Sequence, residues 1–198
     1  TREALILFAA LIMGALGLLL TLNRQTIVLG LIGAAIAISY PLFKRFTHLP
    51  QLYLGIAFSW GIPMAFAAQT GRVPALAWWI LCANLLWTVA YDTMYAMADR
   101  PDDLKIGLKS TAILFGQYDL LVNAVLQALA LAVLGIIGWG LHLNGWYYLG
   151  LVGAAGTAVY QYRLCRGRDR DMCLKAFINN TWFGACVFAG LVFSYHLN

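Results

Sequence analysis

Seven stretches of mostly apolar residues constrain the fold of this chain more than any other feature. They lie near residues 4–21, 26–43, 51–69, 75–92, 118–138, 146–164 and 176–195. A helix needs about 20 such residues to cross the hydrocarbon core of a bilayer. Because 62% of the residues are hydrophobic and only 11% are charged, the chain has too little polar surface for a water-soluble globule. We therefore predict an all-α, polytopic transmembrane bundle of about seven helices, forming one domain over residues 1–198.

Basic residues are distributed unequally between the two sides of this predicted bundle. Arg24 and Arg72 fall on one side. The other eleven of the thirteen fall at the N-terminus or in the second, fourth and sixth loops, namely Arg2, Lys44, Arg45, Arg100, Lys105, Lys109, Arg163, Arg166, Arg168, Arg170 and Lys175. Since cytoplasmic loops are rich in Lys and Arg, we predict that this side is cytoplasmic and that the C-terminus lies outside. Topology and anionic lipid headgroups account for the net charge of +5, so the charge does not indicate a nucleic-acid partner.

Acidic residues gather on the same predicted face, and four of the eight lie between residues 92 and 103. Acids contribute little to topology, so this clustering has another cause. Asp92, Tyr95 and Asp99 follow one another at spacings of three and four residues, which places them on one helix face. Asp103 lies four residues beyond Asp99, so both carboxylates can reach one cation. Because the residue before a proline is biased away from helix, we expect a break near Asp99 and a new helix from Pro101.

This acidic segment has the composition of a metal-assisted phosphate site. Carboxylates this close repel one another unless a cation lies between them. Mg²⁺ prefers oxygen ligands and is commonly held by one or two carboxylates together with substrate phosphates. Lys105 and Lys109 follow, and lysine is a suitable point charge for phosphate oxygens. Residues 99–105 alone fit a solvated loop equally well, but Asp92 and Tyr95 continue the same face into an apolar helix and favour a site for a diphosphate on a lipid tail.

The other chemically reactive residues give no second site. Cys165 and Cys173 have seven residues between them, unlike the close pairs of a zinc knuckle, while Cys82 and Cys186 lie inside apolar stretches. We predict four free thiols. A transporter or channel would also place polar groups among seven spans, but it predicts ionisable residues near the bilayer midplane. Here the acids stop at one face, which disfavours transport.

Two segments of the sequence resemble one family of membrane enzymes. Residues 92–112, DTMYAMADRPDDLKIGLKSTA, resemble the DxxYAxxDxxxD motif and the KxGxKSTA continuation of the UbiA-type prenyltransferases. Residues 40–51, YPLFKRFTHLPQ, resemble the YPxxKRxTxxPQ segment of the same family. The likeness covers essentially the whole chain and is greatest to the 4-hydroxybenzoate polyprenyltransferases of ubiquinone biosynthesis.

The resemblance implies an activity and a location. It implies Mg²⁺-dependent transfer of a polyprenyl group from a polyprenyl diphosphate to the ring of 4-hydroxybenzoate. The protein would lie among the lipids of a bacterial inner membrane with its active face toward the cytoplasm. A different aromatic or lipid-pathway acceptor, and an inactive truncated relative, stay open as alternatives.

The resemblance also assigns roles to residues of this sequence. Asp99 and Asp103 become the main Mg²⁺ ligands, with Asp92 as a further ligand or as a hydrogen-bond partner of one. The residues assigned to substrates are Lys109 and Lys105 at the diphosphate, Arg45 with Lys44 at the diphosphate or the carboxylate of the aromatic acid, and Tyr95 at the cavity wall, where it could equally be packing.

One part of the family's pattern is not found in this sequence. The resemblance implies nine helices and a first aspartate motif, NDxxDxxxD, after the second helix. No Asp occurs between Glu3 and Asp92, so this motif is missing. Seven spans that start on the cytoplasmic side match the family's third to ninth helices. We therefore expect that the first two helices and the first motif are absent from these 198 residues, either because the natural chain extends upstream or because this is a truncated relative.

Overall fold

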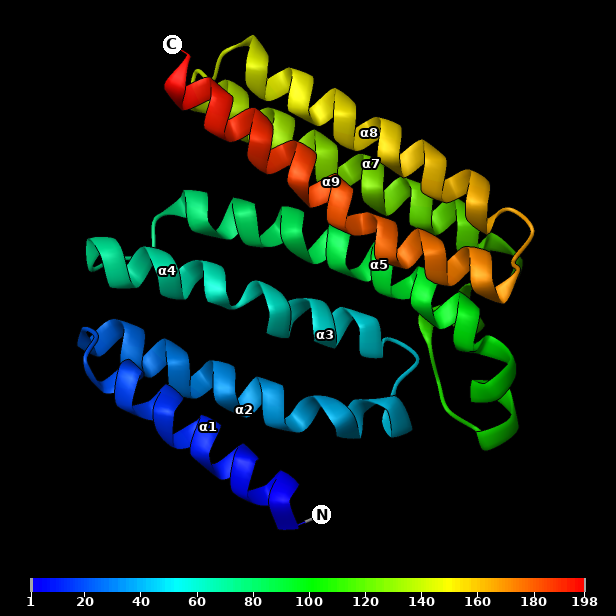
Figure 1. Cartoon of the computed structure of the whole chain (residues 1–198), viewed down its shortest axis with the longest axis horizontal. Helices are drawn as coiled ribbons and strands as arrows, with labels where there is room; N and C mark the ends of the chain where they lie inside the picture. The colour runs from blue at the N-terminus through cyan, green and yellow to red at the C-terminus, as the bar shows by residue number, and fades with distance from the viewer. Residues whose placement is uncertain (1, 198) are drawn as a thin grey trace.

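The computed structural model describes residues 2–197, apart from the side chain of Lys44, and every regular element in that range is helical. The elements run roughly parallel along the long axis of the molecule (Figure 1). In chain order they are α1 (Arg2–Leu20), α2 (Arg24–Phe46), α3 (Pro50–Ser59), α4 (Gly61–Thr70), α5 (Ala75–Ile106), α6 (Thr111–Phe115), the 3₁₀ turn η1 (Gly116–Tyr118), α7 (Asp119–Gly140), α8 (Gly145–Cys165) and α9 (Arg170–His196). The predicted all-α bundle is confirmed.

Six stretches of the described chain are helical, long and apolar enough to cross a membrane. They are Arg2–Leu20, Arg24–Phe43, Pro50–Thr70, Ala75–Lys105, Thr111–Gly140 and Arg170–His196, and they correspond to six of the seven predicted spans. The seventh predicted span, residues 146–164, forms helix α8 over 21 residues. It is not among the six, since glycines, Gln161 and Arg163 make its composition more polar.

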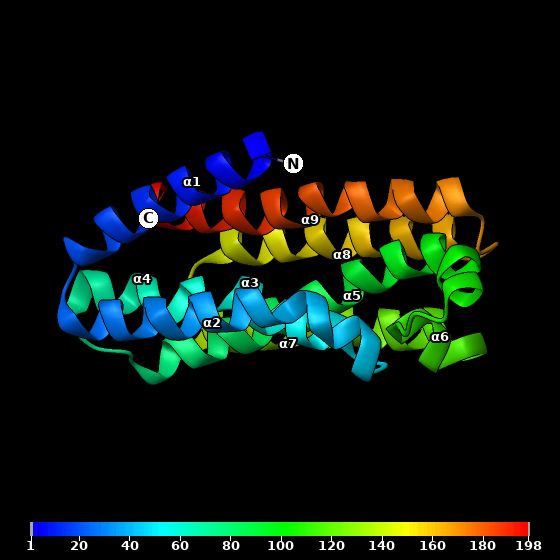
Figure 2. The ribbon, with the colours of Figure 1, turned by 90° about the horizontal axis from the view of Figure 1, so that it is seen from below.

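The connections alternate between the two ends of the bundle. The turns after α2, α5 and α8 lie together at one end, on the right in Figure 1, and α6 lies at that end as well (Figure 2). The turns after α1, α4 and α7 lie at the other end. The three loops that charge counting placed on one side therefore share one end of the structure.

The third apolar stretch is divided into α3 and α4 at Trp60. Pro63 has no N–H to donate and its ring crowds the carbonyl of Ser59, so the helix cannot continue regularly through this turn. The Trp60 ring lies against Gly33 of α2, and its indole N–H donates to the Leu29 carbonyl of the same helix at 2.8 Å. The two short helices together still have the length and apolar composition of one span.

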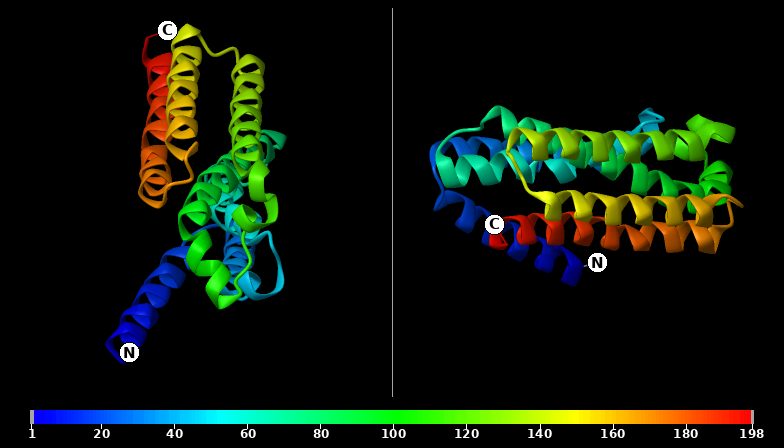
Figure 3. Two further views of the ribbon diagram at one scale, coloured as in Figure 1. Left: turned by 90° about the vertical axis from the view of Figure 1, so that its right-hand side faces the viewer. Right: turned by 90° about the horizontal axis from the view of Figure 1, so that it is seen from above.

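Helices α8 and α9 pack more extensively against each other than any other pair in the described chain. They lie side by side in both panels of Figure 3, whereas α1 leans away from the bundle. A Cβ added to Gly150 would lie 2.6 Å from the Cys186 carbonyl oxygen and 2.8 Å from Cα of Gly190. Glycine is therefore required at this crossing, where small residues let two membrane helices approach backbone to backbone.

Helix α5 is fixed between α7 and α9 by polar side chains inside the bundle. The Asn123 amide of α7 donates to the Ala90 carbonyl at 2.7 Å. The Trp87 indole N–H donates to the Asn180 side chain of α9 at 3.0 Å. Buried polar groups need such partners in an apolar medium, so these two bonds set the depth and rotation of the helix that carries the acidic segment.

Candidate active site

The acidic segment forms one wall of a cavity of about 80 Å³ at the end of α5. Its lining combines acidic, basic and hydroxyl groups from four parts of the chain. Helix α5 contributes Asp92, Tyr95, Ala96, Asp99 and Asp103, while the facing wall consists of Tyr40 from α2, Gln51 from α3, and Lys109 and Ser110 from the segment before α6. The structure thus brings Asp92, Asp99, Asp103, Tyr95 and Lys109 together.

The three carboxylates lie on one continuous helix face. The predicted break near Asp99 is wrong, because α5 runs without interruption from Ala75 to Ile106 with Pro101 inside it. A proline in a helix interior removes one backbone hydrogen bond and costs about 3 kcal/mol. Contacts with the rest of the protein offset this local preference, and Asp99 therefore does not begin a new helix.

Two features hold the last turns of α5. The Arg100 guanidinium donates to the Ala112 carbonyl, to the Gly116 carbonyl at 3.3 Å and to Asp119 at 2.5 Å. The helix ends at Gly107, whose φ of 70° lets its N–H bond back to the Asp103 carbonyl. Glycine is the residue that tolerates this left-handed end, so the helix stops one turn beyond Asp103 rather than before it.

Lys109 reaches the cavity because the segment around it is tied to neighbouring helices. The buried Gln51 side chain accepts the Thr111 N–H at 3.0 Å, and the hydroxyls of Thr93 and Thr111 lie 2.8 Å apart. Ser110 caps α6 by accepting the Ile113 N–H. With the backbone fixed in this way, Lys109 stands at the rim and its ammonium donates to the Phe46 carbonyl at 3.4 Å.

The other predicted substrate residues are placed differently. Lys105 lies on the outer surface, pairs with Asp102 at 3.1 Å and does not line the cavity. Arg45 is exposed in the last turn of α2 and also lies outside the lining. The side chain of Lys44 falls outside the described part of the structure. Tyr95 lines the cavity beside Asp99, and its ring also packs against Phe177 at 5.2 Å.

Several residues around the site, among them Asp119, Arg168 and Arg170, had no predicted role in it. Asp119 is completely buried at the start of α7, where it pairs with Arg100 and Arg168. These hydrogen bonds raise the pKa of the Arg168 guanidinium above its usual value. Arg170 lies 2.9 Å from Asp102 and 3.9 Å from Asp99. The sequence contained a weak signal in the basic run CRGRDRD, but positive-inside charge accounted for it equally well.

The chemistry of the lining suits a magnesium ion. Among residues 2–197, no group of three or more Asp, Glu, His or Cys side chains converges as a complete set of metal ligands. Mg²⁺ does not need such a set, because it keeps several waters and is usually held by one or two carboxylates and substrate phosphates. Asp99 and Asp103, with Asp92 seven residues earlier on the same face of α5, therefore fit the ion in its usual form of binding.

An aromatic row leads from this cavity into the apolar interior. The rings of Tyr95 and Tyr91 lie 5.2 Å and 5.9 Å from the Phe177 ring of α9. Trp87 continues the row, at 5.4 Å from Tyr91 and 5.1 Å from Phe183. Two further cavities, of about 380 and 230 Å³, lie along this row between α5 and α9. The site therefore joins a charged end to a long apolar path.

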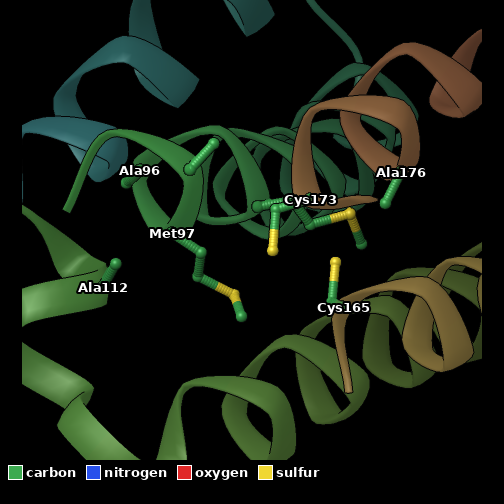
Figure 4. Packing of buried hydrophobic residues seen from close by; sticks show 8 residues of the cluster. Ala96, Met97, Ala112, Cys165, Cys173 and Ala176 are labelled. Carbon is green, nitrogen blue, oxygen red and sulfur yellow. The ribbon is translucent and has the colours of Figure 1, made fainter. Parts of the chain in front are cut away.

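A tightly packed core holds the opposite side of α5. Met94, Met97 and Ala98 of α5 pack with Cys165 and Cys173, whose side chains point toward one another across the cluster (Figure 4). The four cysteines are all free in the described structure, as predicted. Because close-packed interiors resist small displacements, this cluster supports the orientation of the acidic face.

Known proteins with similar sequences and structures were found for the whole chain. The family model described as the UbiA prenyltransferase family matches residues 1–194. The chain is 56% identical over 195 residues to the 4-hydroxybenzoate octaprenyltransferase of Methylococcus capsulatus, covering 98% of this chain and 67% of that protein. It is 54% identical to the enzyme of the same name from Coxiella burnetii, again covering 98% of this chain and 67% of the relative.

A solved structure agrees with the sequence comparison. The apo structure of a UbiA homologue from Aeropyrum pernix has a TM-score of 0.76 and 25% sequence identity, and the match covers 96% of this chain and 73% of that one. The shared fold and the names of the sequence relatives indicate the same family. The chain belongs to the UbiA prenyltransferase family of membrane-bound enzymes.

Proposed function

We propose that this protein transfers a polyprenyl group from a polyprenyl diphosphate to the ring of 4-hydroxybenzoate, in an Mg²⁺-dependent step of ubiquinone biosynthesis. The observation that carries the proposal is the cavity in which Asp92, Asp99, Asp103 and Lys109 meet. Carboxylates for a metal and a lysine for phosphate oxygens are the groups that a diphosphate head requires. The names of the relatives supply the acceptor and the class of tail.

The aromatic row supports a long isoprenoid tail. Its two cavities have Trp87, Tyr91, Phe177 and Phe183 among their walls, and the contact between the rings of Tyr95 and Phe177 connects this row with the acidic cavity. A tail in this path would leave its diphosphate at the acidic end. Aromatic faces and a dry pocket keep water away from the reacting carbon, which protects the transfer from hydrolysis.

The chemistry can be written in terms of the residues present. Asp99 and Asp103 would hold Mg²⁺, which when bound neutralises the diphosphate as it leaves. Lys109 would bind a phosphate oxygen and fix the direction of the head. The allylic C–O bond breaks, a C–C bond forms to the ring of the acceptor, and that ring carbon gives up its proton. Arg45 would bind the carboxylate of the aromatic acid, and its place at the end of α2 puts it on the same end of the bundle.

We further propose that this end faces the cytoplasm of a bacterial inner membrane. Eleven of the thirteen basic residues belong to the N-terminus or to the loops at this end. The positive-inside rule favours that orientation, and it gives a water-soluble aromatic acid access to the cavity.

Prenyl transfer in membranes tests the proposal. Membranes containing the chain, with and without any residues encoded ahead of Thr1, are supplied with 4-hydroxybenzoate, a polyprenyl diphosphate and Mg²⁺. We expect a prenylated product that disappears with a chelator and returns with added Mg²⁺. Asp99→Asn should lower the rate about 100-fold or more, as expected for losing several kcal/mol of charge stabilisation. Asp171→Asn, an exposed acid outside the cavity, is the matched control. Full activity in Asp99→Asn and Asp103→Asn would exclude the metal assignment.

A further inference from the structure

A cluster of three charged residues, Arg100, Arg168 and the buried Asp119 between them, lies beside the candidate metal site and has no part in it so far. Asp119, at the first position of α7, is completely buried. It accepts hydrogen bonds from Arg100 of α5 at 2.5 Å and from the Arg168 guanidinium at 2.8 Å. Arg168 comes from the turn between α8 and α9. One carboxylate therefore joins three parts of the chain.

The geometry of the cluster is closely determined. Arg168 donates from Nε to both carboxylate oxygens of Asp119 at 3.1 Å, and its Nη2, which also donates to Asp119, donates to the Gln117 carbonyl at 2.9 Å. The Leu120 N–H donates to the same carboxylate at 2.7 Å. The backbone of Arg168 has a φ of 53°, a left-handed conformation that a non-glycine residue adopts only when its surroundings hold it there.

Stability alone does not account for this cluster. Removing ions from water costs several kcal/mol each, and buried ion pairs are often no more stable than apolar replacements. The Arg100 Nε is also buried without a hydrogen-bond partner in the described part of the chain. A cluster that costs free energy but has a fixed geometry is better suited to holding a helix in one orientation than to stabilising the fold.

Arg100 acts at the turn that carries the proposed metal ligands. It follows Asp99 directly and precedes Asp103 by three residues, about 100° around α5 from Asp99. Its anchorage to Asp119 therefore sets the rotation of this turn about the helix axis. A rotation of about 20° moves a side-chain atom about 5 Å from the axis by about 2 Å. Mg²⁺ requires ligand distances of about 2.0–2.1 Å in nearly ideal octahedral geometry, so such a shift removes a ligand.

We propose that Asp119 is a positioning residue of the metal site, which through Arg100 and Arg168 fixes the rotation of α5 that presents Asp99 and Asp103 to the cavity. This inference rests on the proposed function, because it takes these two aspartates as metal ligands. Asp119 itself does not line the cavity, so it touches neither the metal nor the substrate.

Metal affinity measured without turnover tests this inference. Mn²⁺, which accepts the same oxygen ligands as Mg²⁺, is titrated by electron paramagnetic resonance against the protein in lipid nanodiscs. The proteins compared are wild type, Asp99→Asn, Asp119→Asn, the double variant, and Arg168→Gln, which leaves Arg100 as a partner for Asp119 and should fold even if Asp119→Asn does not. Gln127→Leu, in the same helix as Asp119, is the control, since it removes the buried hydrogen bond that Gln127 donates to Gln161 of α8 at 2.7 Å.

We expect Asp119→Asn to raise the Kd for Mn²⁺ about 10-fold, in the range measured for residues that orient metal ligands, and Arg168→Gln to raise it less. In the Asp99→Asn background the Asp119 substitution should raise the Kd by a smaller factor than in the wild type, because Asp103 is then the one main ligand left for Asp119 to position. Gln127→Leu should lower thermal stability and leave the Kd unchanged.

The possible failures are distinguishable. Unchanged Mn²⁺ affinity in folded Arg168→Gln and Asp119→Asn, while Asp99→Asn loses it, overturns the inference and leaves the proposed function intact. Effects of Asp99→Asn and Asp119→Asn that simply add also overturn it, since they indicate general destabilisation. Absence of Mn²⁺ binding in the wild type overturns the metal assignment of the proposed function and this inference together.

Discussion

The guanidinium of Arg100 and the carboxylate of Asp119 lie 2.5 Å apart, although 19 residues separate them in the chain. The pair connects the end of α5 with the start of α7 across the short helix α6. Asp119 has no exposed surface, and Arg100 is mostly covered. Loss of one partner therefore leaves the other charged and buried.

This relationship predicts a large effect of Asp119→Ala on stability. Removing one member of a buried ion pair costs about 3–5 kcal/mol, because the remaining charge is left uncompensated. We expect Asp119→Ala to unfold at a clearly lower temperature than wild type in detergent, and Asp169→Ala, at an exposed helix cap, to lose about 1 kcal/mol. Similar losses for the two variants would contradict the buried pairing.

Lys109 and Lys105 are predicted to differ in their effects on substrate binding. Lys109 lines the cavity with the three carboxylates, whereas Lys105 lies outside and pairs with Asp102. A hydrogen bond to a charged group contributes about 1.5–3 kcal/mol, so Lys109→Ala should raise KM for the polyprenyl diphosphate at least about 10-fold. Lys105→Ala should change it less than about 2-fold, as expected for an exposed ion pair. Equal effects would mean that the diphosphate extends beyond the cavity.

Pro101→Ala is predicted to stabilise the protein without loss of prenyl transfer. Pro101 is exposed within a continuous helix, so alanine can restore the missing backbone hydrogen bond with no steric conflict. The helix preference of alanine over proline is about 3 kcal/mol, which sets the upper limit of the gain. Thermal unfolding in detergent measures it. A clear loss of stability or activity would show instead that the chain needs a bend after Asp99.

Gly190→Ala is predicted to destabilise the contact between α8 and α9. The new methyl would lie 2.9 Å from Cα of Gly150 and 3.0 Å from the Tyr147 carbonyl oxygen, and both are backbone atoms that cannot turn aside. Overpacking of this kind costs about 1–3 kcal/mol. Gly135→Ala is the control, since its methyl meets no atom within 4 Å and alanine favours helix by about 1 kcal/mol. If both variants gained stability, the close crossing would be wrong.

Much of the fold could be predicted because a lipid environment leaves few options. Apolar stretches of about 20 residues can only be helices in a bilayer, and the chain has them at regular intervals. Helical spacing also predicted that Asp92, Asp99 and Asp103 lie on one face of a helix. One local prediction was wrong, namely the break near Asp99 with a new helix from Pro101. It followed from the backbone preference of a residue before proline and did not include the contacts that oppose it. Those contacts involve Asp119 and Ala112, which local sequence rules do not connect with Arg100.

The parts of the site that sequence could not predict all depend on distant residues. Arg168 and Arg170 lie about 50 and 70 positions from the residues they bind, and their charges had an adequate explanation in membrane topology. The different places of Lys105 and Lys109 follow from where α5 stops at Gly107 and how Thr111 is held by Gln51. Neither the end of α5 nor the position of Lys109 can be predicted from residue spacing alone.

The length of α5 determines how far the acidic cluster stands from the middle of the bilayer. Its 32 residues make a helix about 48 Å long, while the hydrocarbon core is about 30 Å thick. A tilt of about 20° shortens the length of the helix along the membrane normal by only about 3 Å. About ten residues therefore extend beyond the hydrocarbon core. With Ala75 at the opposite surface of the hydrocarbon core, Asp99 and Asp103 would lie on this emergent part, at the height of the phosphate headgroups. A lipid-borne donor and an acceptor dissolved in water could meet there without either one leaving its own phase.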